Sequence, residues 1–321
     1  MPLWLSESDV RASLAPGGLI DAVEGALAAF SSGCVTHPLR TAFQIGEQSF
    51  FAIMPAFDGA QAILGAKLVS VVPPNGARGL PTHLASISLF DTATGQLAAV
   101  MDGRYITEVR TAAASAVSVR RLARPDASVL AILGSGVQAR SHLAALSLVR
   151  EFSEVRAWSP TADHLRRFVE ESGAPVRAAA SAADAVRGAY VIVVATSSVT
   201  PAIEDAWVSP GAHVVAIGAC RPTQQEIDPA LVARSRLVVD SREAALAESG
   251  DIVRPMRDGR FGADHVAAEL GEIVCASKPG RLDPGEVTLF KSLGLAIEDL
   301  VAARLAFRRA KEAGRGITVE L

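Results

Sequence analysis

Two charged residues inside short apolar segments, and a third on an alanine-rich segment, suggest how a substrate could be bound. Arg40 and Lys67 belong to the first kind, and Arg110 is the third. A buried charge is costly unless it has a function or a partner. An arginine can grip a carboxylate through two hydrogen bonds, whereas a lysine can also exchange a proton. We therefore predict that Arg40 and Lys67 bind an anionic substrate. The alternative is that each cation pairs with a carboxylate such as Asp102 or Glu108.

A glycine-rich turn predicts a dinucleotide site. The segment Val129–Leu133 is apolar throughout, as in a parallel strand buried on both faces. Gly134, Ser135 and Gly136 follow, Ala139 takes the third small position of a G-x-G-x-x-A pattern, and a helical spacing of apolar residues begins. Such glycines allow a tight turn, and the N–H groups that open the helix can bind a pyrophosphate. Glycines also occur in purely structural turns, but here strand, turn and helix come in the required order.

The end of the next strand indicates which dinucleotide binds. An NAD site usually has an acidic residue there, but this sequence reads Trp158-Ser159-Pro160-Thr161. Ser159, Thr161 and His164 could hydrogen-bond a 2′-phosphate, and no carboxylate would repel it. The sequence therefore favours NADP(H). NAD(H) stays the alternative, because no arginine stands where it would clamp the phosphate.

Two patterns divide the chain and predict an α/β protein. Between residues 35 and 103, short apolar runs separated by turn signals predict an antiparallel sheet within an α+β domain. From Ser128 onward, strands alternate with helices, which predicts a doubly wound, Rossmann-type parallel sheet. The apolar spacing of Leu295–Ala313 predicts a helix that returns to the first domain. We predict domains at 1–124, completed by 292–321, and at 125–291. The predicted parallel strands are Val129–Leu133, Val155–Trp158, Val176–Ala178, Tyr190–Ala195, His213–Ile217 and Leu237–Val239.

Composition excludes several classes of function. The 321 residues carry a net charge of −3, which gives no reason to expect nucleic acid or an acidic membrane as partner. The N-terminus lacks the pattern of a signal peptide, and no apolar run is long enough to span a bilayer. Three scattered cysteines, Cys34, Cys220 and Cys275, suggest a reducing compartment. We expect a cytoplasmic protein. We expect no metal site, because the six histidines show no metal-binding spacing.

Seven motifs together resemble the ornithine cyclodeaminase/mu-crystallin family, nearly from end to end. The resemblance implies a homodimer, with an N-terminal domain that binds substrate and forms the dimer, followed by a Rossmann domain. It also implies that the C-terminal helix rejoins the first domain. The motifs are Met101–Gly103, Arg110–Ser115, Ile132–Ala139, Ala216–Pro222, Glu243–Asp251, Phe290–Gly294 and Ile297–Asp299.

The same resemblance assigns roles to individual residues. It implies that Arg40 and Lys67 face the substrate carboxylate and that Leu293 lines the substrate pocket. Either Thr82 or His83 would face the cofactor. The other residues expected at the cofactor are Arg110, Ser135, Val137, Gln138, Thr196, Ser197, Ile217 and Ser292.

One departure from the family pattern bears on the reaction. Ornithine cyclodeaminases carry a catalytic aspartate two residues after the glycine that corresponds to Gly218, and this chain has Cys220 there, followed by Arg221-Pro222. A thiol cannot replace a carboxylate that faces an ammonium group, and we interpret Cys220 as a small residue lining the substrate pocket. The pattern is closer to that of the mu-crystallin-like ketimine reductases.

The resemblance therefore implies NAD(P)H-dependent reduction of a cyclic ketimine carboxylate. Examples are 1-pyrroline-2-carboxylate and 1-piperideine-2-carboxylate, which would yield L-proline and L-pipecolate. Lys67, or a water that it orients, is the predicted proton source. Three alternatives remain open: an alanine-type amino-acid dehydrogenase, an ornithine cyclodeaminase, and a non-enzymatic crystallin-like protein that binds small ligands.

Overall fold

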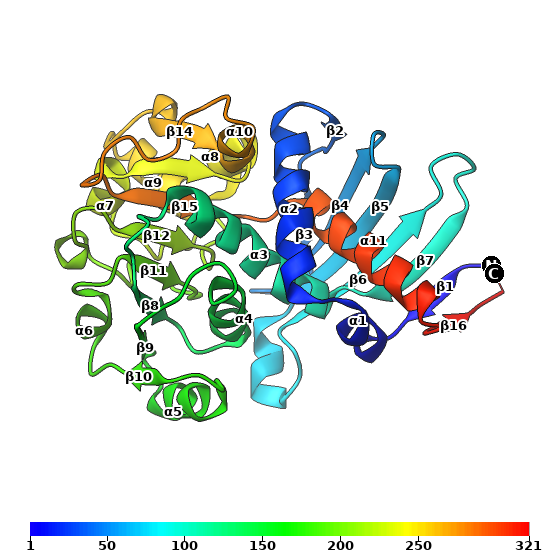
Figure 1. The fold of residues 1–321 in the computed structure, drawn as a ribbon, viewed down its shortest axis with the longest axis horizontal. Coiled ribbons are helices and arrows are strands. Elements are labelled where there is room, and N and C mark those ends of the chain that lie inside the picture. Colours follow the sequence, from blue (N-terminus) through cyan, green and yellow to red (C-terminus); the bar gives the residue numbers. More distant parts are fainter. Residues whose placement is uncertain (321) are drawn as a thin grey trace. The chain divides into compact units, whose positions relative to one another are not determined.

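The computed structural model describes residues 1–320, and the chain forms two units (Figure 1). The first comprises Met1–Arg110 together with the segment from Leu295 onward, and the second comprises Thr111–Gly294. The predicted fold class is confirmed: one unit holds a parallel, Rossmann-type sheet and the other a largely antiparallel sheet.

The first unit is built on an eight-stranded sheet with the strand order β16-β1-β7-β6-β5-β4-β2, and β3 also pairs with β4. Side chains along β4 and β5 alternate between a buried and a more exposed face, as a sheet covered on one side requires. Helices α2 and α11 pack together, and α11 crosses β4, β5 and β6 (Figure 1). The strands are β1 (Leu3–Leu5), β2 (Val35–Thr36), β3 (Thr41–Gln44), β4 (Phe50–Asp58), β5 (Ile63–Val71), β6 (His83–Phe90), β7 (Leu97–Asp102) and β16 (Ile317–Thr318).

Three α-helices lie wholly within this unit: α1 (Glu7–Ser13), α2 (Pro16–Ser31) and α11 (Ala296–Glu312). Ser6 and Asp9 form a capping box at the start of α1. Helix α11 is buried along most of its length, including its first turn. The prediction that the C-terminal helix packs on the first unit is confirmed.

The second unit is built on an eight-stranded parallel sheet with the order β10-β9-β8-β11-β12-β15-β13-β14. Apart from His213, strands β8, β11 and β12 are apolar, and they are almost fully buried, as expected for a sheet with helices on both faces. The strands are β8 (Val129–Leu133), β9 (Glu154–Trp158), β10 (Val176–Ala178), β11 (Val191–Val194), β12 (His213–Ala216), β13 (Arg236–Val239), β14 (Val266–Glu269) and β15 (Thr288–Lys291).

The helices of this unit are short. The sequence patterns did not predict α7, α9, α10 or strand β14, because these elements have few residues and α9 contains Pro255. The helices are α4 (Val137–Leu146), α5 (Ala162–Glu171), α6 (Ala182–Val186), α7 (Pro229–Arg234), α8 (Arg242–Glu248), α9 (Gly250–Arg257) and α10 (Leu270–Val274).

The boundaries between the two units differ from those predicted from the sequence. The first division lies within helix α3 (Arg104–Leu122) rather than at Pro125. The second half of α3 is tied to the parallel-sheet unit, because Ser115 hydrogen-bonds His142 at 2.8 Å and Ser118 hydrogen-bonds His213 at 3.0 Å.

The second division, between Gly294 and Leu295, lies slightly beyond the predicted one. The Asp240 carboxylate accepts hydrogen bonds from Ser292 Oγ and from the backbone N–H groups of Leu293 and Gly294. These three residues are therefore held by the parallel-sheet unit, and the first unit resumes where α11 is about to begin.

Among residues 1–320, no helix is long and apolar enough to cross a membrane. Within the same residues, no group of three or more His, Cys, Asp or Glu side chains is placed to hold a metal ion.

Candidate active site

Lys67 and Asp299 form the centre of a buried ionic cluster in the first unit. Lys67 lies on the covered face of β5 and is only 2% exposed, and its Nζ lies 2.5 Å from Asp299 Oδ2. Asp299 is fully buried in the first turn of α11, where a negative charge also complements the helix dipole. The packing of α11 on β5 therefore brings together two charges that are far apart in the sequence.

The surroundings of Lys67 lower its pKa to about 8. Burial is the largest cause, because it disfavours the charged ammonium, and the positive charges of Arg110 and Arg40 act in the same direction. The Asp299 carboxylate opposes them and keeps the pKa from falling further. A lysine with this pKa can give up and regain a proton near neutral pH.

Arg110 belongs to the same cluster. Its Nε lies 2.9 Å from Asp299 Oδ1, and its Nη1 lies 2.8 Å from Glu298 Oε2. Burial lowers the pKa of Arg110, but the two carboxylates outweigh it and raise the pKa above the ordinary arginine value. The prediction that Arg110 faces a cofactor is not tested by these contacts.

Lys67 and Arg110 do pair with carboxylates, but not with Asp102 or Glu108, the two that the sequence suggested. Glu108 pairs with Arg104 and Arg11, and Asp102 accepts a hydrogen bond from the backbone of Tyr105. Lys67 and Arg110 instead pair with residues of the C-terminal helix, which no local pattern could indicate.

Arg40 requires a correction of a different kind. It precedes β3, and all four residues of that strand are exposed, so the premise that Arg40 lies within a buried apolar strand was wrong. Arg40 is half-buried, and its charge reaches Lys67 strongly enough to lower the lysine pKa. Its predicted role toward a substrate carboxylate stays a prediction.

His83 opens strand β6 near the same cluster. Burial lowers its pKa to about 4, and the positive charges of Lys67 and Arg110 contribute further. His83 is therefore neutral near pH 7. Thr82, the alternative cofactor residue, lies just outside the strand and is exposed.

The glycine-rich turn of the second unit has the geometry that a dinucleotide pyrophosphate requires. Gly134 has φ +124°, and a Cβ there would lie 2.5 Å from the carbonyl oxygen of Ala195. Gly136 is the N-cap of α4, provides no side-chain cap, and would have open space around a Cβ. The first turn of α4 contains no acidic residue. These residues fit a bound pyrophosphate at the helix N-terminus.

Residues next to this turn are consistent with that fit. Ser135 Oγ donates to Ser159 Oγ at 3.0 Å, which joins the turn to the end of β9. Gln138 carries a buried Oε1 that has no hydrogen-bond partner among the described residues. Val137 is 47% exposed, and Thr161 and His164 are exposed at the start of α5.

The remaining predicted residues lie at or just beyond the carboxyl ends of β11, β12 and β15. Ile217 and Leu293 are buried, Ser197 is exposed, and Cys220 is half-buried with its thiol donating to the carbonyl of Ile217. Thr196 donates to Glu226, and Ser292 donates to Asp240. Sequence reasoning did not single out Glu226 or Asp240, and it placed Asp299 in a family motif without giving it a role, although an acidic residue beside a buried apolar element was a usable signal.

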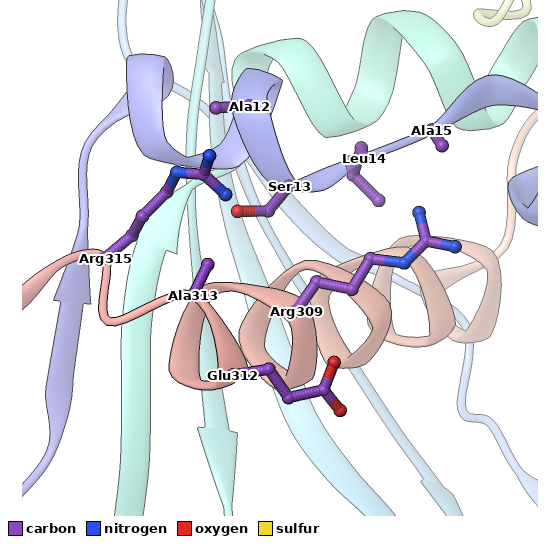
Figure 2. Close-up of a pocket in the computed structure, with 8 residues that line it drawn as sticks. All are labelled: Ala12, Ser13, Leu14, Ala15, Arg309, Glu312, Ala313 and Arg315. Carbon is purple, nitrogen blue, oxygen red and sulfur yellow. The ribbon is translucent and has the colours of Figure 1, made fainter.

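A pocket of about 560 Å³ in the first unit contains none of the predicted residues (Figure 2). It lies between the end of α1 and the end of α11, and it is not the candidate site. Its lining residues are Ala12, Ser13, Leu14, Ala15, Arg309, Glu312, Ala313 and Arg315.

Comparison with known proteins identifies the family. The model of the ornithine cyclodeaminase/mu-crystallin family matches residues 2–314. The chain belongs to this family. It is 42% identical over 311 residues to ketimine reductase mu-crystallin of Mus musculus, covering 95% of this chain and 96% of that protein.

Two solved structures are similar to this chain over almost the whole length of both proteins. Thermococcus litoralis Delta(1)-pyrroline-2-carboxylate reductase, in complex with NADH and L-proline, matches with TM-score 0.96 and 38% identity over 99% of this chain and 100% of that one. An archaeal alanine dehydrogenase dimer with bound NAD matches with TM-score 0.95 and 32% identity, over 100% of this chain and 99% of that one.

Proposed function

We propose that the protein reduces a cyclic ketimine carboxylate with NAD(P)H, acting on a CH–NH bond. The observation that carries this proposal is Lys67, a buried lysine whose pKa of about 8 is lowered by burial and by the charges of Arg110 and Arg40. The similarity to a ketimine reductase and to a pyrroline-2-carboxylate reductase supports the same reaction.

The roles of the chain's own residues follow from their charges. Arg40 would hold the substrate carboxylate, with Lys67 alongside. When bound, the dinucleotide supplies a hydride to the imine carbon. Lys67, or a water that it orients, gives a proton to the imine nitrogen, which becomes the amine, and Lys67 then regains a proton from solvent. Asp299 keeps Lys67 oriented and partly protonated near neutral pH.

We propose that NADPH is preferred and that NADH is also accepted. Gly134, Ser135 and Gly136 would hold the pyrophosphate at the start of α4. Ser159, Thr161 and His164 would lie toward the adenosine ribose, where the chain offers hydroxyl and imidazole groups rather than a carboxylate.

We also propose a homodimer formed through the outer face of the antiparallel sheet. Ile53 and Leu68 are directly paired across β4 and β5, and both remain more than a third exposed. Phe57 and Leu84 extend the same apolar face. An exposed apolar patch of this kind marks an interaction surface. Light scattering should show a dimer for the wild type and a monomer for Leu68→Glu.

We also propose a cytoplasmic location, on independent grounds. Among residues 1–320 no disulfide joins any of the three cysteines, and Cys34 and Cys275 are exposed. Exposed thiols suit a reducing compartment. Cell fractionation would test this assignment directly.

The decisive experiment is a screen of NADPH and NADH oxidation with five- and six-membered cyclic imine carboxylates. Turnover without ammonia is the expected result. An absolute requirement for free ammonia would instead indicate an alanine-type dehydrogenase. Cofactor binding without any turnover would favour a crystallin-like binding protein, and ammonia release from L-ornithine with NAD would indicate a cyclodeaminase.

A further inference from the structure

A second buried ionic cluster lies at the carboxyl ends of the parallel strands. Lys291, the last residue of β15, is fully buried, and its Nζ lies 2.9 Å from Asp251 Oδ2 and 3.4 Å from Glu226 Oε1. Both carboxylates are also buried. None of these three residues belongs to the site proposed above.

Glu226 does more than pair with this lysine. Its Oε1 accepts hydrogen bonds from the backbone N–H groups of Gly218 at 2.6 Å and Ala219 at 3.1 Å. Its Oε2 accepts from Thr196 twice, from the backbone N–H at 3.1 Å and from Oγ1 at 3.0 Å. One carboxylate therefore ties together the loop after β11 and the turn after β12.

These two loops neighbour the glycine-rich turn. Strands β8, β11, β12 and β15 are adjacent in the sheet, and their last residues, Leu133, Val194, Ala216 and Lys291, are in register. Ligands of doubly wound sheets bind outside these carboxyl ends. A Cβ at Gly218 would overlap the carbonyl oxygen of Thr196, so the two loops also touch directly.

We propose that Glu226 is a positioning residue for dinucleotide binding, acting by holding the Thr196 loop and the Gly218–Cys220 turn with its two carboxylate oxygens. The inference rests on the proposed function, because it assumes that a dinucleotide binds at this edge. Asp251 and Lys291 have a different task. Asp251 holds the backbone of Glu226, because its Oδ1 accepts hydrogen bonds from the N–H groups of Glu226 and Ile227. Lys291 pairs with the Glu226 carboxylate.

Two isosteric substitutions separate these tasks. In Glu226→Gln the single remaining oxygen can serve only one loop, and the amide NH2 faces the donors of the other. In Asp251→Asn the oxygen can keep both backbone N–H groups, while the NH2 replaces the oxygen nearest Lys291. The second variant therefore disturbs the ion cluster but leaves the loop contacts of Glu226 in place.

The experiment compares both variants with the wild type by three measurements on folded protein. Without cofactor, amide hydrogen exchange in Glu226→Gln should rise in peptides covering residues 195–198 and 217–220, and in Asp251→Asn it should stay at the wild-type level there. Fluorescence titration should show NADPH binding weakened about 10- to 100-fold in Glu226→Gln and less than about threefold in Asp251→Asn. The thermal midpoint should fall in both.

The outcomes distinguish this inference from the proposed function. Wild-type exchange and wild-type NADPH affinity in Glu226→Gln would overturn the inference alone. Equal weakening of NADPH binding in the two variants would also overturn it, because the effect would then come from the ion cluster. If the wild type binds no dinucleotide, the proposed function fails and the inference fails with it. If it binds NADPH but reduces no imine, the reaction assignment fails and the inference stands.

Discussion

The two units each contain a fully buried lysine, and their surroundings drive its pKa in opposite directions. Lys67 pairs with one carboxylate near two arginines, and burial with these positive charges lowers its pKa to about 8. Lys291 faces two carboxylates, Asp251 and Glu226, which outweigh burial and raise its pKa above the ordinary value. Burial alone therefore does not make a lysine a proton donor. The balance of neighbouring charge decides whether it exchanges a proton or remains a permanent cation.

The largest expected effect comes from removing the exchangeable lysine. Lys67→Met should lower kcat for imine reduction by about 10²- to 10⁴-fold, the range typical for loss of a general acid. NADPH affinity should change little, and Lys67→Arg should not restore the rate, because arginine does not release its proton. Steady-state kinetics and a cofactor titration on the same preparation check this. A folded Lys67→Met protein with normal kcat would remove Lys67 from the mechanism.

The matching substitution in the other cluster should act on stability. Lys291→Met leaves Asp251 and Glu226 as buried carboxylates without their cation, which should lower the free energy of unfolding by about 3–5 kcal/mol. Chemical denaturation provides the measurement. If Lys291→Met were as stable as the wild type but had lost its pH-dependent activity, the contrast between the two lysines would be wrong.

The pH profile sharpens the comparison further. Because Lys67 must be protonated to act as an acid, kcat/KM for reduction should be level below about pH 8 and fall above it. Asp299 raises the lysine pKa, so Asp299→Asn should move the start of this fall to lower pH. A profile recorded between about pH 6 and about pH 10, which spans the pKa of Lys67, decides the point. A shift to higher pH in Asp299→Asn would contradict the electrostatic account.

The smallest effect is expected at Ser159, which lies far from either lysine in the sequence. Ser159→Asp introduces the acidic residue that NAD sites usually carry at this position and should shift the preference from NADPH toward NADH by about 1–3 kcal/mol. Separate fluorescence titrations with the two cofactors measure it, with Thr161→Ser as a control that keeps the hydroxyl. An unchanged ratio of affinities would show that the ribose does not bind beside Ser159.

Local patterns predicted the repeating parts of this molecule well. The bounds of the strand Val129–Leu133 were predicted to the residue, because a buried parallel strand is apolar throughout. The turn predicted at Gly134 is also present, and the positive φ of this residue explains why a glycine stands there. The ion pairs were not predictable in the same way. Asp299 reaches Lys67 because α11 packs across β5, and the apolar spacing of this helix predicted its return to the first unit but not which strand it would cross. Arg40 shows the opposite error, since an apolar neighbourhood in the sequence proved to be an exposed strand.

The return of α11 to the first unit has a consequence for the order in which the chain can fold. Residues 111–294 are continuous and can complete their sheet as soon as they leave the ribosome. The first unit is made earlier but cannot close its core until the last helix has been synthesised. Until then Lys67 and Arg110 lack the carboxylates of Asp299 and Glu298. The half of the protein that is translated first is therefore the half that matures last, and a nascent chain interrupted before residue 296 would leave it open to chaperones and proteases.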